Sequence, residues 1–225
     1  MRYAMIMAGG AGTRLWPMSR KTEPKQLIKF IEGPGGVQRS LLEIAAGRLE
    51  GLVPEKNRYI CTSEGYRGVI RRDLKAFGDQ QILGEPVGRD TVNAVGFAAA
   101  VLHKIDKNAI FAVLTADHII EPDEVFRERM DLGFKLIEAD PRRLVTFSIK
   151  PTYAATGFGY VERGTPVRDV KGAEKLAFHV QRFVEKPDLA TAQQQLDAVR
   201  ATPTAGALGE LVAHILLLPQ SQQLE

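Results

Sequence analysis

Residues 3–14 have the sequence YAMIMAGGAGTR, an apolar run that changes abruptly into glycines and ends on an arginine. The apolar part is too short for the core of a signal peptide or for a membrane span, so we interpret it as a buried first strand. Glycines directly after a strand let the backbone approach a phosphate closely and present N–H groups to it. The stretch therefore predicts an anion-binding loop at the end of a buried strand.

The spacing of these glycines excludes two common phosphate-binding loops. A dinucleotide fingerprint starting at Gly10 would need a glycine at Leu15, and no Gly-Lys-Ser/Thr follows as it would in a Walker A loop. For the glycines alone, a plain tight turn remains open. The cations that follow within a dozen residues are Arg14, Arg20, Lys21 and Lys25. This density of positive charge, interrupted only by Glu23, suits a triphosphate.

Strand-like and helix-like segments alternate after this loop. Several of the strand candidates are continuous apolar runs, which is typical of a parallel sheet covered on both faces. The expected strands are Tyr3–Met7, Arg58–Thr62, Gln81–Leu83, Ala109–Thr115 and Leu144–Ser148. The expected helices are Ser40–Leu49, Thr91–Lys107 and Pro122–Ala139. We predict an α/β fold with a doubly wound, mostly parallel sheet, which binds ligands at the carboxyl ends of its strands.

Local signals support these helices. Ser40 is followed three residues later by Glu43, which is the spacing of a capping box. Asp90 or Thr91 would cap the next helix, although a helix start also attracts phosphate. The third helix has apolar residues at helical spacing, namely Phe126, Met130, Phe134 and Ile137.

The later part of the chain changes character twice. A loop of glycines and aromatics over 156–161 leads into a strand, and Phe178–Val184 is a second strand candidate, which together predict a small β insertion. From Ala201 onward only two residues are charged, both of them glutamates. We expect one domain over 1–200 and a divergent tail over 201–225, with a short helix around Leu208–Leu218.

Composition limits the kinds of molecule that we expect this protein to bind. The net charge is +3, which gives no field that would favour nucleic acid or a membrane surface. Hydrophobic residues make up 44% of the chain, an ordinary globular value, and we expect a cytoplasmic protein. The one cysteine, Cys61, follows a strand-like run and is interpreted as a small buried apolar residue rather than a nucleophile.

Several motifs together resemble the sugar nucleotidyltransferases. The run GGAGTRLWP at 9–17 with PKQ at 24–26 is similar to the signature loop of that family, and LWPMSR at 15–20 resembles its GDP-mannose-forming branch. Further similar segments follow in the same order along the chain. They are EPVGRDT at 85–91, LTADH at 114–118, KPT at 150–152, TGFGY at 156–160 and FVEKP at 183–187. The resemblance covers about residues 1–192.

The resemblance implies a Rossmann-like nucleotidyltransferase fold and transfer of GMP from GTP to mannose 1-phosphate with Mg²⁺. Arg14 and Lys25 are the implied catalytic residues, and Asp117 is the implied metal ligand. The implied nucleotide-binding residues are Gly9, Gly10, Gly12, Thr13, Arg89, Asp90 and Thr91. The implied sugar-phosphate-binding residues are Gly157, Glu185 and Lys186. Independently of the family, a carboxylate just after an apolar strand, as at Asp117, suits a hard cation.

Alternatives remain at the level of the sequence. After Gln193 the family pattern stops, so we expect a truncated or divergent short form, in which a second metal ligand and the contacts of a homodimer are in doubt. A transferase for another base or sugar phosphate, a non-catalytic nucleotide-binding remnant and a plain interaction domain are the competing functions. Locally, Asp117 is alternatively a loop cap, His118 is a structural or a ligand-orienting residue, and Glu185 with Lys186 is alternatively a solvated charge pair.

Overall fold

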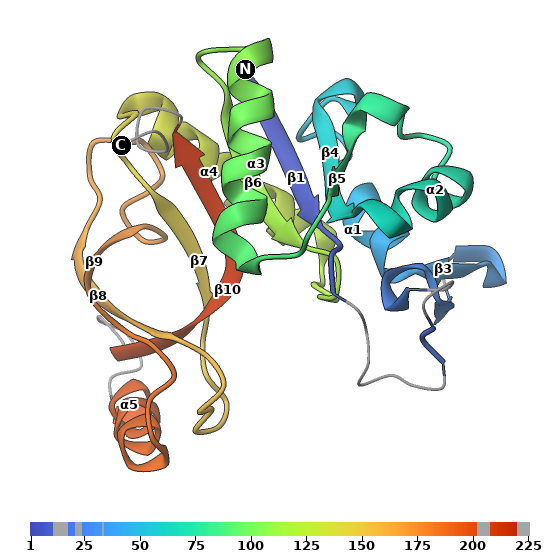
Figure 1. Ribbon diagram of the computed structural model, residues 1–225. Coiled ribbons are helices and arrows are strands. Elements are labelled where there is room, and N and C mark those ends of the chain that lie inside the picture. The colour runs from blue at the N-terminus through green and yellow to red at the C-terminus, as the bar shows by residue number, and fades with distance from the viewer. Residues whose placement is uncertain (11–17, 21–23, 33, 202–207, 220–225) are drawn as a thin grey trace. The chain divides into compact units, whose positions relative to one another are not determined.

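The computed structural model describes residues 1–10, 18–20, 24–32, 34–201 and 208–219. The chain forms two compact units, the first from Met1–Leu144 with Leu216–Glu225 and the second from Val145–Ile215 (Figure 1). Within the described residues, no helix has both the length and the apolar character needed to cross a membrane.

Parallel strands form the centre of the first unit, in the order β5-β4-β1-β6. β1 (Arg2–Met7) lies between β4 (Arg58–Ser63) and β6 (Ile110–Thr115), and β5 (Ile82–Glu85) pairs with the far side of β4. Every one of these strands was expected within two residues of its observed bounds. The predicted α/β fold with a mostly parallel sheet is therefore confirmed.

Four α-helices occur in the described part of the first unit; the first three lie between its parallel strands and the fourth follows β6. They are α1 (Leu41–Gly47), α2 (Glu64–Asp73), α3 (Asp90–Ile105) and α4 (Asp123–Ala139). The predicted capping box is present, because Glu43 N donates to Ser40 Oγ at 3.2 Å and Ser40 N donates to Glu43 Oε2 at 2.6 Å. These two bonds satisfy backbone N–H groups that the start of α1 leaves unpaired.

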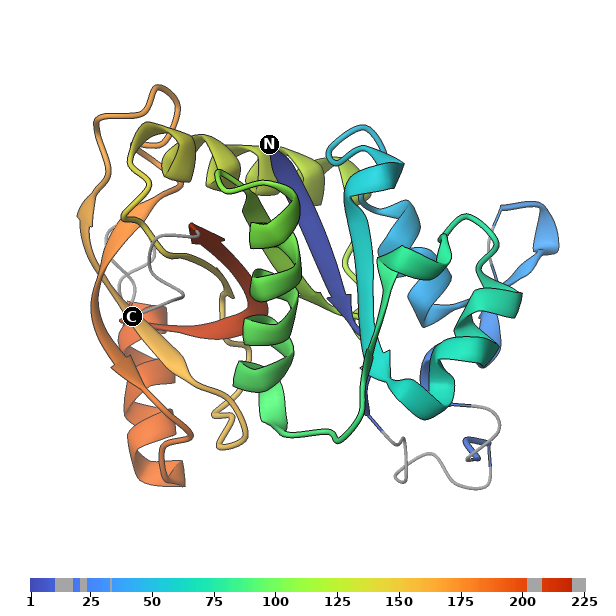
Figure 2. The same ribbon diagram turned by 45° about the horizontal axis from the view of Figure 1, so that its top comes forward.

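α3 and α4 lie on opposite faces of the sheet (Figures 1 and 2). Alternate residues of the strands, such as Tyr3 and Met5, form a buried cluster with the alanines of α3. The helical spacing predicted for α4 is confirmed by burial of Phe126, Met130, Phe134 and Ile137, which are at most 6% exposed. Burial on both faces explains why β1, β4 and β6 are continuous apolar runs rather than alternating ones.

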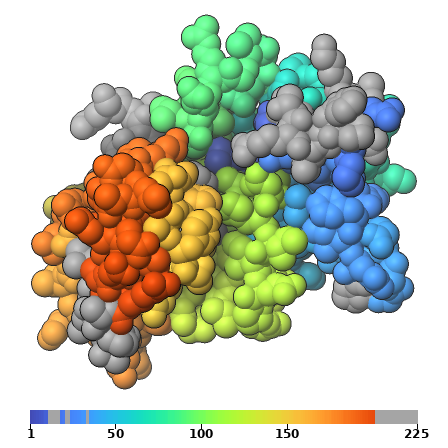
Figure 3. All heavy atoms as spheres, turned by 90° about the horizontal axis from the view of Figure 1, so that it is seen from below, coloured from blue at the N-terminus to red at the C-terminus, as the bar shows by residue number. Residues whose placement is uncertain are grey.

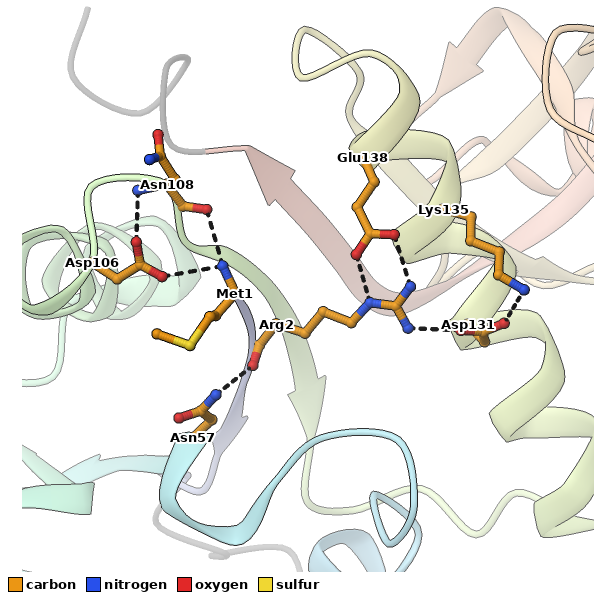
Figure 4. Close-up of polar contacts among 8 residues, drawn as sticks. All are labelled: Met1, Arg2, Asn57, Asp106, Asn108, Asp131, Lys135 and Glu138. Atoms are coloured by element: carbon orange, nitrogen blue, oxygen red, sulfur yellow. Dashed lines mark hydrogen bonds and ion pairs between the residues drawn. The ribbon is translucent and has the colours of Figure 1, made fainter.

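Ion pairs tie the amino end of β1 to both helices (Figure 4). The N-terminal amine lies 3.1 Å from Asp106 Oδ2, just after α3. On the other side, the Arg2 guanidinium lies 2.7 Å from carboxylate oxygens of both Asp131 and Glu138 in α4. The first strand is thus fixed at the edge of the sheet opposite to its glycine-rich end.

In its described residues, the second unit is an antiparallel β structure with one α-helix. β8 (Tyr160–Pro166) pairs with β9 (Phe178–Val184), whose bounds agree with the prediction, and α5 (Leu189–Ala201) follows. Tyr160, Ala155 and Ala192 form its buried cluster. Gly159 has a packing reason, because an added Cβ would lie 2.4 Å from Cζ of Phe183. The expected small β region is confirmed.

The expected helix around Leu208–Leu218 is wrong, because this segment is the strand β10 (Leu208–Pro219). Its last residues, Leu216–Pro219, pair antiparallel with β6, and its first residues pair with β8. β7 (Val145–Ile149) also pairs with β10. An apolar run of this length is compatible with a helix or a strand. Here the segment is a strand because it pairs with the edges of β6 and β8.

Other elements had no clear sequence signal. α2 and α5 were not expected, and neither was the hairpin of β2 (Lys29–Glu32) and β3 (Gln38–Ser40). The short 3₁₀ helices are η2 (Lys25–Leu27), η3 (Pro34–Gly36), η4 (Glu55–Asn57) and η5 (Asp79–Gln81).

Candidate active site

The carboxyl ends of the parallel strands of the first unit meet at one edge of the sheet. Met7, the last residue of β1, is paired with Cys61 on one side and with Thr115 on the other. Ser63 at the end of β4 is paired in turn with Glu85 at the end of β5. Loops that follow these residues therefore start side by side, at the edge where α/β sheets bind ligands.

The start of the glycine-rich loop is held against its neighbours by hydrogen bonds. Ala8 N donates to Cys61 O at 2.7 Å, and Thr62 Oγ1 donates to Ala8 O at 3.1 Å. Gln26, only 2% exposed, donates from Nε2 to Gly10 O at 3.1 Å. A Cβ at Gly10 would lie 3.6 Å from Cε of Lys25, so the lysine side chain lies next to this glycine.

The structure describes only two of the predicted nucleotide-binding and catalytic residues in this loop. Gly9 and Gly10 are exposed at the edge of the sheet. Gly12, Thr13 and Arg14 lie outside the described residues, so their roles stay predictions.

Lys25 and Asp117 are brought together although 92 residues separate them in sequence. Lys25 Nζ lies 2.8 Å from Asp117 Oδ2, and the two side chains are 22% and 42% exposed. Burial raises the pKa of Asp117, but the hydrogen bond and the charge of Lys25 outweigh it and hold that pKa below its ordinary value. Asp117 is therefore an ionised carboxylate at neutral pH.

The segment that carries Asp117 is anchored on both sides of that residue. Ala116 N donates to Met7 O at 3.0 Å, which continues the pairing between β6 and β1 by one residue. His118 Nδ1 lies 3.1 Å from Thr115 Oγ1. This contact supports the structural role that was one of the two interpretations of His118.

Glu85 and Cys61 lie beneath this edge. A Cβ at Gly9 would be 3.6 Å from Glu85 Oε2, which places that carboxylate next to the glycine-rich loop. Burial raises the pKa of Glu85, and a hydrogen bond with Cys61 opposes the rise. Burial also raises the pKa of Cys61 to about 12, so its thiol stays protonated, as expected for a buried apolar residue.

Arg89, Asp90 and Thr91 are exposed at the junction of β5 and α3. Arg89 occupies the N-cap position and makes no side-chain capping hydrogen bond, so the expectation that Asp90 or Thr91 caps this helix is wrong. Asp90 instead has a φ of +50°, and Asn93 Nδ2 donates to the carbonyl of Arg89. The first N–H groups of α3 thus lack a side-chain cap at the N-cap position.

The sugar-side residues all belong to the second unit. Gly157 is exposed in the loop before β8, and a Cβ there would meet no atom within 4 Å. Glu185 and Lys186 directly follow β9, and Lys186 Nζ lies 3.5 Å from Glu185 Oε1. These side chains are 61% and 65% exposed, which also agrees with a solvated charge pair.

The side chains at the sheet edge fit a metal ion that is coordinated mainly by phosphate oxygens of a bound nucleotide. Among the described residues, no cluster of three or more His, Cys, Asp or Glu side chains is arranged to hold a metal ion. Asp117 supplies one ionised carboxylate beside a loop suited to phosphate. Mg²⁺ is commonly bound in this way, through one or two carboxylates, phosphate oxygens and water.

Residues missed by sequence reasoning also contribute to this edge. Gln26 supports Gly10, and Arg48 donates from Nη2 to the carbonyl of His118 at 3.0 Å. Gln26 belongs to the PKQ motif, but no role was assigned to it, and Arg48 had no signal beyond its place at a helix end, where basic residues are common.

Comparisons with known proteins identify relatives of this chain. A sequence model of the family described as nucleotidyl transferase matches residues 3–202. A mannose-1-phosphate guanylyltransferase of Salmonella montevideo is 41% identical over 196 residues, which are 86% of this chain and 40% of that protein. A mannose-1-phosphate guanylyltransferase of Klebsiella pneumoniae is 37% identical over 198 residues, 87% of this chain and 40% of that protein.

A solved structure has the same fold. The protein from Thermus thermophilus named mannose-1-phosphate geranyltransferase is 30% identical and has a TM-score of 0.77, covering 98% of this chain and 58% of its own. The chain spans about 40% of the length of the curated relatives named above. The part matched by the family, residues 3–202, contains every predicted site residue from Gly9 to Lys186. By this match and by these identities, the chain is a member of the nucleotidyl transferase family.

Proposed function

We propose that this protein transfers GMP from GTP to mannose 1-phosphate, forming GDP-mannose and releasing pyrophosphate. The observation that carries the proposal is the Lys25–Asp117 pair beside Gly10 at the carboxyl edge of the sheet. The choice of guanine and mannose rests on relatives that are named mannose-1-phosphate guanylyltransferase.

The chemistry needs no nucleophile from the protein. A phosphate oxygen of the sugar phosphate attacks the α-phosphorus of the nucleotide, and the bond from that phosphorus to pyrophosphate breaks. Catalysis then consists of alignment and neutralisation of negative charge. A protonated Cys61 is consistent with this, because no thiolate is required.

Each group at the edge has a role in this scheme. The N–H groups of Gly9, Gly10, Gly12 and Thr13 would bind the triphosphate, and Arg14 would hold the departing pyrophosphate. Lys25 would stabilise the charge that develops on the α-phosphate. The uncapped start of α3, with Arg89, Asp90 and Thr91, would contact the nucleotide, since helix N-termini attract anions.

Asp117 would hold the divalent cation, for which we propose Mg²⁺. Bound there, the ion would supply positive charge to phosphate oxygens. The hydrogen bond between Asp117 and Lys25 keeps the Asp117 carboxylate ionised. The same carboxylate would therefore hold both positive charges that face the phosphates, the Lys25 ammonium and the metal ion. On the sugar side, Glu185 would accept hydrogen bonds from hydroxyls, Lys186 would bind the sugar phosphate, and Gly157 would leave room for the sugar.

A pyrophosphate-release assay with the full chain, GTP, mannose 1-phosphate and Mg²⁺ tests the reaction, with GTP binding followed in parallel by calorimetry. We expect release only when both substrates are present. Release with glucose 1-phosphate or with another nucleotide, but not with this pair, would move the assignment to a different transferase. Binding of GTP without any release would reduce the proposal to a nucleotide-binding protein.

Variants assign the roles of the cations. We expect Lys25→Ala and Arg14→Ala each to lower turnover by roughly a hundredfold to a thousandfold while the chain stays folded, as for loss of one transition-state donor. Lys29→Ala is a matched control, because Lys29 is close in sequence but pairs with Glu43 at 3.5 Å, away from Asp117. Near-normal turnover in both test variants would exclude the assigned roles.

A further inference from the structure

Arg48, at the end of α1, is a buried cation for which the proposed reaction has no direct use. Its side chain is 1% exposed. Burying a guanidinium costs free energy unless it is fully paired, and here Nε makes no hydrogen bond. Burial lowers the pKa of Arg48, although Asp123 and Glu121 oppose the effect. Because replacing a buried ion pair by apolar residues is often neutral or stabilising, stability alone does not explain an arginine here.

The contacts of Arg48 lead to one segment of the chain. Nη2 donates to the carbonyl of His118 at 3.0 Å, and Nε lies 3.5 Å from Asp123 Oδ1. The guanidinium carbon lies 5.2 Å from the centre of the Phe126 ring, which adds a cation–π contact. Arg127 Nε in turn donates to the carbonyl of Arg48 at 3.2 Å.

These contacts join the end of α1 to α4 and, at His118, to the connection between β6 and α4. Figure 3 shows the yellow-green residues of this connection and of α4 beside the blue residues that include α1. We call residues 116–121 the Asp117 loop. The loop is held by the sheet at Ala116, through its bond to Met7 O, and by Arg48 at His118. Asp117 lies between these two attachments, and its carboxylate meets Lys25.

We propose that Arg48 is a positioning residue that fixes the Asp117 loop, and through it the carboxylate that pairs with Lys25. The inference rests on the proposed function only for the catalytic consequence, because the restraint on the loop is a property of the free protein. One attachment on each side of Asp117 limits the positions of its carboxylate. A misplaced ligand at a reacting centre is costly even when the change lies outside the site.

The test uses Arg48→Met, which keeps an unbranched apolar side chain at this buried position but removes the charge and the bond to His118. Hydrogen exchange of the ligand-free full chain, followed by mass spectrometry, measures the Asp117 loop directly. We expect exchange in residues 116–121 to become about tenfold faster, because one attachment is lost, with no change in segments that do not contact Arg48. We expect kcat to fall by roughly tenfold to a hundredfold with little change in KM, because Asp117 is misplaced in the transition state.

Arg58→Met is the matched control. Arg58 also donates to carbonyls at the end of α1 and just beyond it, those of Ala46, Leu49 and Val53, and none of these belongs to the Asp117 loop. We expect it to lower the melting temperature without faster exchange in 116–121. Arg48→Lys, which keeps the charge but not the planar fork, should restore part of the protection.

The outcomes separate the two proposals. Unchanged exchange of residues 116–121 in Arg48→Met, or equal acceleration in Arg58→Met, would overturn the positioning role whatever the activity. Absence of turnover in the unaltered chain would count against the proposed function and leave the exchange measurement to decide on Arg48.

Discussion

At the scale of single residues, Arg2 makes a contribution to stability that depends on pH (Figure 4). Its hydrogen bonds hold the pKa of Glu138 below the ordinary value, and for Asp131 the pairs with Lys135 and Arg2 outweigh the rise caused by burial. A carboxylate whose pKa is lowered in the folded state stabilises the fold at pH values above its pKa in the unfolded chain, which is near 4. This stabilisation is lost as the pH falls through the pKa of the folded state. Both carboxylates are partly exposed, so we discount the contribution to about 1 kcal/mol for screening.

Arg2→Gln should therefore lower the free energy of unfolding by about 1 kcal/mol at pH 7 and by much less near pH 2. Urea unfolding at several pH values measures the difference. Arg142→Gln is the control, because that side chain is 84% exposed and its pair with Asp140 should contribute nothing measurable. A deficit that stays constant from pH 7 to pH 2 would show that Arg2 acts through packing on Phe134 rather than through charge.

The position of Asp117 was predictable from sequence because this residue closely follows the strand β6, whereas its pairing with Lys25 was not predicted. Lys25 and Asp117 are near each other because the loops after β1 and β6 leave the same edge of the sheet. Arg48 was not predictable, since a basic residue at a helix end normally suits the helix dipole on the surface. Its burial depends on Asp123 and Phe126, which only the fold brings to α1.

At the scale of elements, the start of α1 offers a clean test of capping. Ser40→Ala removes the oxygen that accepts from Glu43 N, at a serine that is 1% exposed, so the freed N–H stays without a partner. We expect a loss of about 1–2 kcal/mol in the free energy of unfolding, measured by urea titration. Ser63→Ala at the N-cap of α2 is the control, because Ser63 makes no side-chain capping bond, and we expect a change of less than about 0.5 kcal/mol. Equal losses would mean that the box at α1 contributes nothing specific.

The helices and strands differ in how well local sequence patterns predict them. α1 and α4 were predictable because a cap and a periodic apolar face are local signals. α2 was not, since its sequence EGYRGVIRRD has two glycines and only Ile70 is buried. The strand β10 was mistaken for a helix because its partners, β6 and β8, are far away in sequence and an apolar run alone does not reveal them.

At the scale of the whole molecule, the pairing of β10 with β6 covers what would otherwise be an open edge of the sheet of the first unit. The residues of β6 from Phe111 to Leu114 are at most 2% exposed, so an uncovered edge would present backbone donors and acceptors on an apolar strand. A chain that ends at Ala201 should therefore self-associate, which sedimentation velocity or light scattering detects. The control ends at Pro219, the last residue of β10, and should sediment as the full chain does. If the shorter chain stayed as dispersed as the control, β10 would not be what protects this edge, and association in both would place the protecting contact after Pro219.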